Sequence, residues 1–140
     1  MITTEKTKGA SIKEIKKRET ERKEKELREK CEAIAIERFT KEQVVKWSND
    51  NKGLWFLPVM DDAGEAIEAL AIMRPITRTI LSYASTKIQD EGLYEFLEAA
   101  MRECFIAGDN VILDEDEYFI PAANQFNKIL EGKKAALLKR

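Results

Sequence analysis

The strongest constraint on the fold is an apolar stripe between residues 93 and 104. Its members recur at i, i+3, i+4, i+7, i+8 and i+11: Leu93, Phe96, Leu97, Ala100, Met101 and Cys104. This spacing places all of these side chains on one face of an α-helix, and such a face is stable only when other elements cover it. The chain must therefore build a core around this helix. Gly108 suits the residue that follows the helix C-terminus.

Two apolar runs upstream of this helix, residues 54–60 and 66–73, predict a β-hairpin. Both runs are short, the first contains the aromatic pair Trp55-Phe56, and an Asp-rich segment containing Gly64 separates them. Pro58 has no N–H to donate, so the first run should be an edge strand or carry a bulge there. The alanines of the second run leave a helix over residues 65–73 as the alternative.

Further helices are predicted on both sides of the hairpin. Thr40, with a glutamine three residues later, is a capping-box pattern that opens a short helix. Pro75 suits the first turn of a helix that reaches about residue 88. Asp114 can cap a last helix, but Pro121 lies inside it, so that helix begins later than Asp114 or kinks at the proline. The fold class is therefore α+β and mainly helical, with a short hairpin at about 54–73 packed by three to four helices.

Charge divides the chain into an arm and a body. Residues 1–30 hold 11 basic and 7 acidic side chains, a net charge of +4, whereas residues 31–140 hold 13 and 19, a net charge of −6. Residues 1–30 are thus expected to form a charged, partly frayed helical arm, and residues 31–140 a compact helical domain. Lys16-Lys17-Arg18 leaves nucleic acid open as a partner of the arm, but the interleaved glutamates and the lack of aromatic residues make it the less favoured one.

The composition argues against an enzyme. The chain has no histidine, the commonest general base and metal ligand, and no phosphate-binding glycine loop. Cys31 and Cys104 are expected to be buried, reduced thiols. Acidic groups at 61–62 and 114–117 suit a turn and a helix N-terminus rather than a metal site. We therefore expect no catalytic residue, no cofactor and no metal, and, since no apolar run is long enough to span a membrane, a cytoplasmic location.

A protein partner is the favoured ligand. Trp47, Trp55 and Phe56 gather beside a polar loop, where they pack in the core or mark a binding surface. With them, the first residues of the apolar stripe, Leu93, Phe96 and Leu97, are the candidate partner-binding residues. Self-association of the chain is left open.

Residues 54–130 resemble a group of small phage and prophage proteins, the tail assembly chaperones. The resemblance rests on a basic-Pro step after an apolar strand, a Leu-Ser pair, a Cys-to-Gly-Asp turn, an acidic loop and a Phe/Ala-rich helix. Here these are Met73-Arg74-Pro75, Leu81-Ser82, Cys104–Asp109, Asp114–Glu117 and Phe119–Ala123. The charged arm and Pro121 depart from that pattern. The resemblance implies a non-catalytic protein that binds apolar segments of a partner, such as a tape-measure protein, in the cytoplasm of the host cell.

Two alternatives stay open. A structural virion component, such as a connector or minor head–tail protein, would form oligomers and remain in the particle. A nucleic-acid-binding regulator would use the basic residues of segment 13–30.

Overall fold

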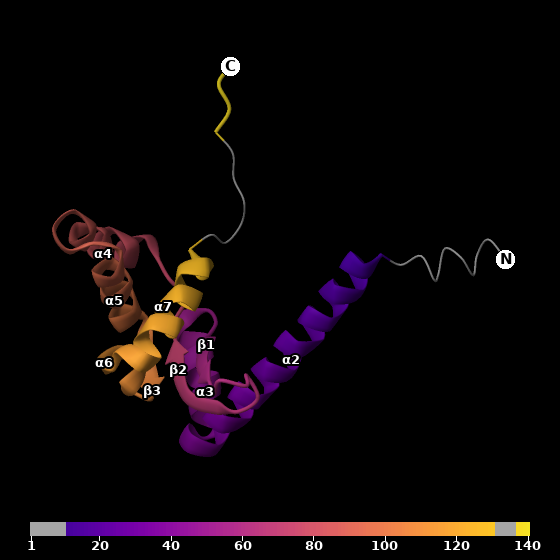
Figure 1. Ribbon diagram of the computed structural model, residues 1–140. Helices are drawn as coiled ribbons and strands as arrows, with labels where there is room; N and C mark the ends of the chain where they lie inside the picture. Colours follow the sequence, from indigo (N-terminus) through magenta and orange to yellow (C-terminus); the bar gives the residue numbers. More distant parts are fainter. Residues whose placement is uncertain (1–10, 131–136) are drawn as a thin grey trace.

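The computed structural model describes residues 11–130 and 137–140, and in them the chain is mainly helical with one small sheet (Figure 1). In chain order the elements are α2 (Ile12–Phe39), α3 (Lys41–Asn51), β1 (Trp55–Met60), β2 (Ile67–Met73), α4 (Arg78–Glu91), α5 (Leu93–Cys104), β3 (Phe105–Gly108), α6 (Val111–Asp114) and α7 (Asp116–Ile129). The predicted mainly helical α+β class is confirmed.

The sheet is antiparallel with the strand order β1-β2-β3. The hairpin is confirmed: β1 pairs with β2 along its whole length, and the register shifts between Val59 and Met60. Pro58 lies in β1, an edge strand, where its missing N–H breaks no ladder bond. The alternative of a helix over residues 65–73 is wrong, because β2 has a strand on each side and its backbone bonds to both.

Helices cover both faces of the sheet. On one face, Ile72 packs with Ala35 of α2 and Val44 of α3. On the other, Ala69, Ala71 and Met73 contact the larger core formed with α4, α5, α6 and α7. Strand side chains alternate between faces, so β2 contributes to both cores. Figure 1 shows that only the C-terminal part of α2 lies beside the sheet, while the rest projects away from the body.

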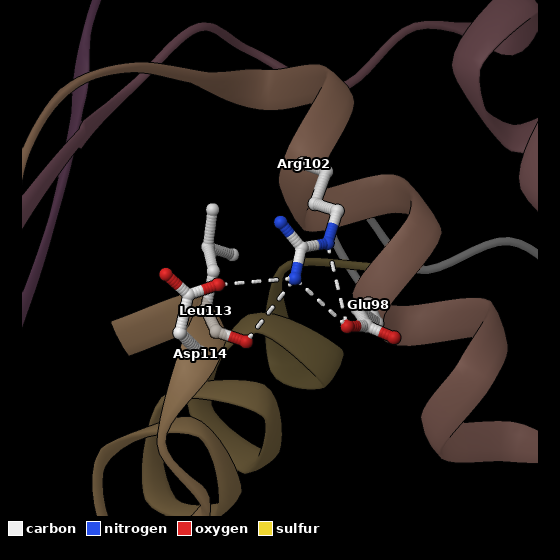
Figure 2. Close-up of polar contacts among 4 residues, drawn as sticks. All are labelled: Glu98, Arg102, Leu113 and Asp114. Carbon is white, nitrogen blue, oxygen red and sulfur yellow. Dashed lines mark hydrogen bonds and ion pairs between the residues drawn. The ribbon is translucent and has the colours of Figure 1, made fainter. Parts of the chain in front are cut away.

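The apolar stripe of α5 forms the centre of the larger core. Phe96, Leu97, Ala100, Met101 and Cys104 are buried, as the spacing predicts, and Leu93 at the start of the helix is exposed. Arg102, on the outer side of α5, connects this helix to α6: its Nη2 lies 3.0 Å from Glu98 and 3.3 Å from Asp114 (Figure 2). The same nitrogen is 3.5 Å from the carbonyl oxygen of Leu113.

Three predicted helix boundaries are wrong: the starts at Pro75 and at Asp114, and the end before Gly108. Helix α4 begins at Arg78 rather than at Pro75, because the Thr77 hydroxyl accepts the Ile80 N–H and caps it. Asp114 ends α6 instead of capping the last helix, since its carboxylate accepts a bond from Arg102. Helix α7 begins at Asp116, later than Asp114, which is one of the two outcomes that Pro121 predicted.

The third correction concerns Gly108, which belongs to a strand that the sequence pattern did not predict. Residues Phe105–Gly108 form β3 and pair with β2. The Asp109 backbone and side chain continue this pairing: Leu70 N–H donates to the carboxylate at 2.9 Å, and Asp109 N–H donates to the Leu70 carbonyl at 2.9 Å. Arg38 of α2 bonds both oxygens of the same carboxylate at 3.2 Å. This turn therefore joins α2, the sheet and the start of α6.

Candidate partner-binding groove at the open edge of the sheet

A groove of about 660 Å³ lies along the open edge of β1. Its floor is β1, one wall is α2 and the other wall is α7, and Figure 1 shows these helices on the two sides of the strand. We call it the β1 groove. Its lining residues are Glu24, Leu27, Arg28, Cys31, Leu54, Trp55, Phe56, Leu57, Pro58, Met60, Gln125 and Ile129. Its size is that of ordinary ligand sites in proteins.

The lining is largely apolar, and part of it is open to solvent. Trp55 is 46% exposed and Met60 38% exposed, at opposite ends of β1. Leu27 and Ile129 are half-buried on the helix walls. Exposed apolar side chains gathered along one groove are typical of interaction sites. The groove therefore offers a partner apolar surface that the described residues of the chain leave uncovered.

Cys31 is part of the apolar wall of the groove, and its thiol is not activated as a nucleophile. Burial raises the pKa of its thiol to about 11, so that the group stays neutral at physiological pH. Cys104, in the larger core, has a pKa of about 11 for the same main reason. Both cysteines are free and buried, as predicted. A neutral buried thiol is a poor nucleophile.

The β1 groove adjoins a second, smaller hollow of about 420 Å³ at the Met60 end of the strand. Four carboxylates line this hollow, from Asp61, Asp62, Glu68 and Glu117, and no basic side chain is in its lining. We call these four residues the acidic end. The negative charge of Glu68 is the main reason why the pKa of the Tyr118 phenol, also in the lining, is raised above its usual value. The two hollows share Pro58, Met60 and Gln125.

The turn after β1 holds the acidic end in place. Asp61 Oδ1 accepts the Glu65 N–H at 2.9 Å, and the Asp61 N–H donates to the Ala66 carbonyl at 2.9 Å. Backbone N–H groups that bond the carboxylate, that of Glu65 first and that of Ala66 next, lower the pKa of the Asp61 carboxyl. Asp61-Asp62 thus serve a turn, as the sequence pattern predicts.

The structure brings together only two of the predicted partner-binding residues. Trp55 and Phe56 line the β1 groove. Trp47 instead packs edge-on against Phe39, with ring centroids 5.4 Å apart, in the core beneath α2 and α3. Leu93 is exposed on α5, outside the lining of the groove, while Phe96 and Leu97 are 7% and 1% exposed in the larger core.

Sequence reasoning missed the helical walls, Leu27 and Ile129. Each belongs to an apolar pattern that predicts core packing, and nothing in the local sequence shows that the two side chains line opposite walls of one groove. Pro58 was the available signal, because it predicted an edge strand at this position.

In the described part of the chain, no group of three or more Cys, Asp or Glu side chains is arranged to hold a metal ion. No helix in residues 11–130 or 137–140 has the length and apolar character needed to cross a membrane.

Comparison with protein-family models, with curated proteins and with solved structures finds no match for this chain.

Proposed function

We propose that this protein is a non-catalytic binding protein that holds an apolar segment of a partner protein in the β1 groove. The proposal includes the more specific role that the sequence resemblance implies, that of a phage tail assembly chaperone-like protein acting on a tape-measure protein in the host cytoplasm. The single observation that carries the binding role is the open apolar groove, with Trp55 exposed at one end and Met60 at the other.

The physical basis of the binding role is removal of apolar surface from water. Each square ångström of apolar area that a partner covers contributes about 25 cal/mol to association, before the entropy of binding is subtracted. A protein with a short uncovered groove can therefore hold apolar segments of a long partner reversibly. Such reversible shielding is what the assembly of a hydrophobic protein into a larger structure requires.

The first experiment is co-expression with a fragment of a tape-measure protein from the same genome. If the proposal holds, the fragment stays in the soluble fraction and co-purifies with this protein. Trp55→Ser should release the fragment, because it removes an exposed aromatic side chain from the groove. Tyr83→Ser is the matched control, because Tyr83 is 51% exposed on α4 and lies outside the groove lining. This variant should keep the fragment soluble and co-purify with it as the wild type does.

The projecting part of α2 favours a second candidate function, a structural component of the virion. A long exposed helix that leaves the body can pack against neighbouring subunits (Figure 1). This role requires a stable oligomer in solution and the presence of the protein in purified particles. A chaperone is absent from those particles, so the particle composition separates the two candidates.

A further inference from the structure

We propose that the β1 groove binds its partner as an added β-strand. The partner segment runs antiparallel to β1, with Lys or Arg side chains beside the acidic end and apolar residues along the rest of the groove. This inference rests on the proposed function, since it uses the same groove, and it adds the conformation and the chemical class of the bound segment.

The backbone of β1 is oriented for strand addition. The Asp61 N–H points to β2, where it bonds the Ala66 carbonyl. Because amide direction alternates along a strand, Phe56, Pro58 and Met60 turn their backbone groups to the open edge. The other side of the sheet agrees: Leu70, which pairs with Pro58, bonds Asp109 through both its N–H and its carbonyl.

The open edge therefore presents two donors and three acceptors to an incoming strand, and Pro58 leaves one donor missing at the centre. An antiparallel partner is favoured because antiparallel pairing is the more stable per residue and needs no crossover. An added strand would lie about 4.8 Å from β1 and follow its length of about 20 Å.

The helix walls suit the side chains of such a strand. Alternate side chains of an added strand point to opposite faces of the sheet. Those on one side would meet Leu27 and Cys31 of α2, and those on the other would meet Ile129 of α7. Both walls are apolar at these positions, so both sets of partner side chains should be apolar.

The negative charge at the Met60 end of the groove indicates which partner side chains bind there. The acidic end carries four carboxylates, and its lining holds no basic side chain to neutralise them. A Lys or Arg of the partner would supply that charge, whereas an acidic partner would be repelled. For an antiparallel strand, the basic residues come before the apolar ones in the partner sequence.

The C-terminal residues of this chain also combine apolar and basic side chains. Leu137 and Leu138 are 101% and 86% exposed and stand next to Lys139 and Arg140 in this chain. In this segment the basic residues follow the apolar ones, so a second copy could place them beside the acidic end only if the segment runs parallel to β1. The experiment below includes that outcome.

The test uses the full-length protein and a synthetic peptide in which a Lys-Lys pair precedes alternating Leu and Val residues. NMR of ¹⁵N-labelled protein should show slower amide hydrogen exchange at Phe56 when the peptide binds. The Leu57 amide, which already faces β2, is the matched control and should not change. A peptide N-methylated at alternate residues keeps its side chains but loses the donors, and it should bind about tenfold more weakly.

Charge reversal tests the proposed class of partner. The pair Asp62→Lys and Glu117→Lys should weaken binding of the Lys-Lys peptide about tenfold and strengthen binding of a Glu-Glu version. Glu103→Lys, at an exposed position of α5 outside both linings, should leave both affinities unchanged. Circular dichroism checks that every variant keeps its helical content.

The outcomes separate the two proposals. If the N-methylated peptide binds as well as the parent, strand addition is overturned, while binding of apolar segments stands. Equal binding of a peptide with its lysines moved to the other end overturns the antiparallel direction. Tighter peptide binding by a Leu137→Ser/Leu138→Ser variant would identify a second copy as the occupant. If no apolar peptide binds, the proposed function itself fails.

Discussion

At the scale of single residues, Gly108 shows how closely β3 approaches β2. Its φ of 127° lies in the region that favours glycine, and a Cβ built there would be 2.2 Å from the Leu70 carbonyl oxygen. That oxygen accepts the Asp109 N–H, so it cannot move without breaking the turn that joins α2 to the sheet. Glycine is therefore required by backbone contact and by backbone conformation together.

Gly108→Ala should lower the free energy of unfolding by about 3 kcal/mol, from steric overlap and from backbone strain. The matched control is Gly64→Ala, which has a positive φ of 70° but no atom within 4 Å of the new methyl group. That variant should lose only about 1 kcal/mol. Urea unfolding followed by circular dichroism measures both values, and equal losses would contradict the close approach.

Asp61 makes the free energy of unfolding depend on pH in the acid range. Its carboxyl pKa is lowered in the folded protein by backbone bonds, the Glu65 N–H first, so the charged form stabilises the fold at neutral pH. This contribution should disappear as the pH falls below the ordinary value of 3.8 and through the folded pKa. Asp61→Asn should therefore be less stable than the wild type at neutral pH, and the difference should close in acid.

Urea midpoints of the two proteins across this pH range provide the measurement. Asp62→Asn is the control, since it removes the neighbouring charge and leaves the Asp61 bond to Glu65 intact. A difference between Asp61→Asn and the wild type that stays constant into acid would show that the bond does not depend on the carboxylate charge.

At the scale of elements, α2 is one continuous helix with two different environments. Cys31 and Ala35 are its buried residues, and every side chain from Ile12 to Glu26 is exposed. The Arg22–Glu26 ion pair, at 4.0 Å and well exposed, adds little to its stability. The continuity of α2 across residue 30 comes from good helix-forming residues rather than from packing.

Hydrogen exchange should divide α2 at about Leu27. Helices that lack tertiary contacts are marginally stable in water, so amides before Leu27 should exchange close to the rate of an unstructured chain. Amides from Cys31 to Phe39 should be strongly protected, because this segment packs on the sheet. Mass spectrometry of proteolytic fragments resolves the two segments, and uniform protection along α2 would mean that the arm packs on another chain.

At the scale of the whole molecule, the sheet is shared by two cores. Ile72 packs with α2 and α3, whereas Ala71 and Met73 face the larger core. Arg38 and Asp109 tie the same layers together at Leu70, in the middle of β2. A molecule whose central strand belongs to both cores should unfold as one cooperative unit.

Ile72→Ala should therefore weaken both layers at once, at a cost of about 3 kcal/mol for the cavity that it leaves. Tryptophan fluorescence includes Trp47 beneath α2, and far-ultraviolet circular dichroism reports all helices. The urea transitions from the two signals should coincide in the wild type and should move together in Ile72→Ala. Separate transitions would show that the α2–α3 layer unfolds by itself.

Local patterns in the sequence determined the elements whose signals are local. The α5 stripe, the hairpin with its edge strand at Pro58, the cap at Thr40 and the buried cysteines could all be predicted. Each depends on side-chain spacing, on a missing donor or on a capping hydroxyl within a few residues. Trp55 and Phe56 were candidates for the same reason, because aromatic residues beside a polar loop are visible in the sequence.

Only the tertiary structure decided which segments far apart in the sequence pack or pair with one another. Strand β3 is four residues long and shows no alternating pattern, and it forms because β2 offers a free edge to Phe105–Gly108. The burial of Phe96 and Leu97, and the position of Leu27 and Ile129 on opposite walls of the β1 groove, likewise depend on how helices pack on a sheet. Packing is set by contacts between residues far apart in the chain, so the groove follows from the fold rather than from any motif.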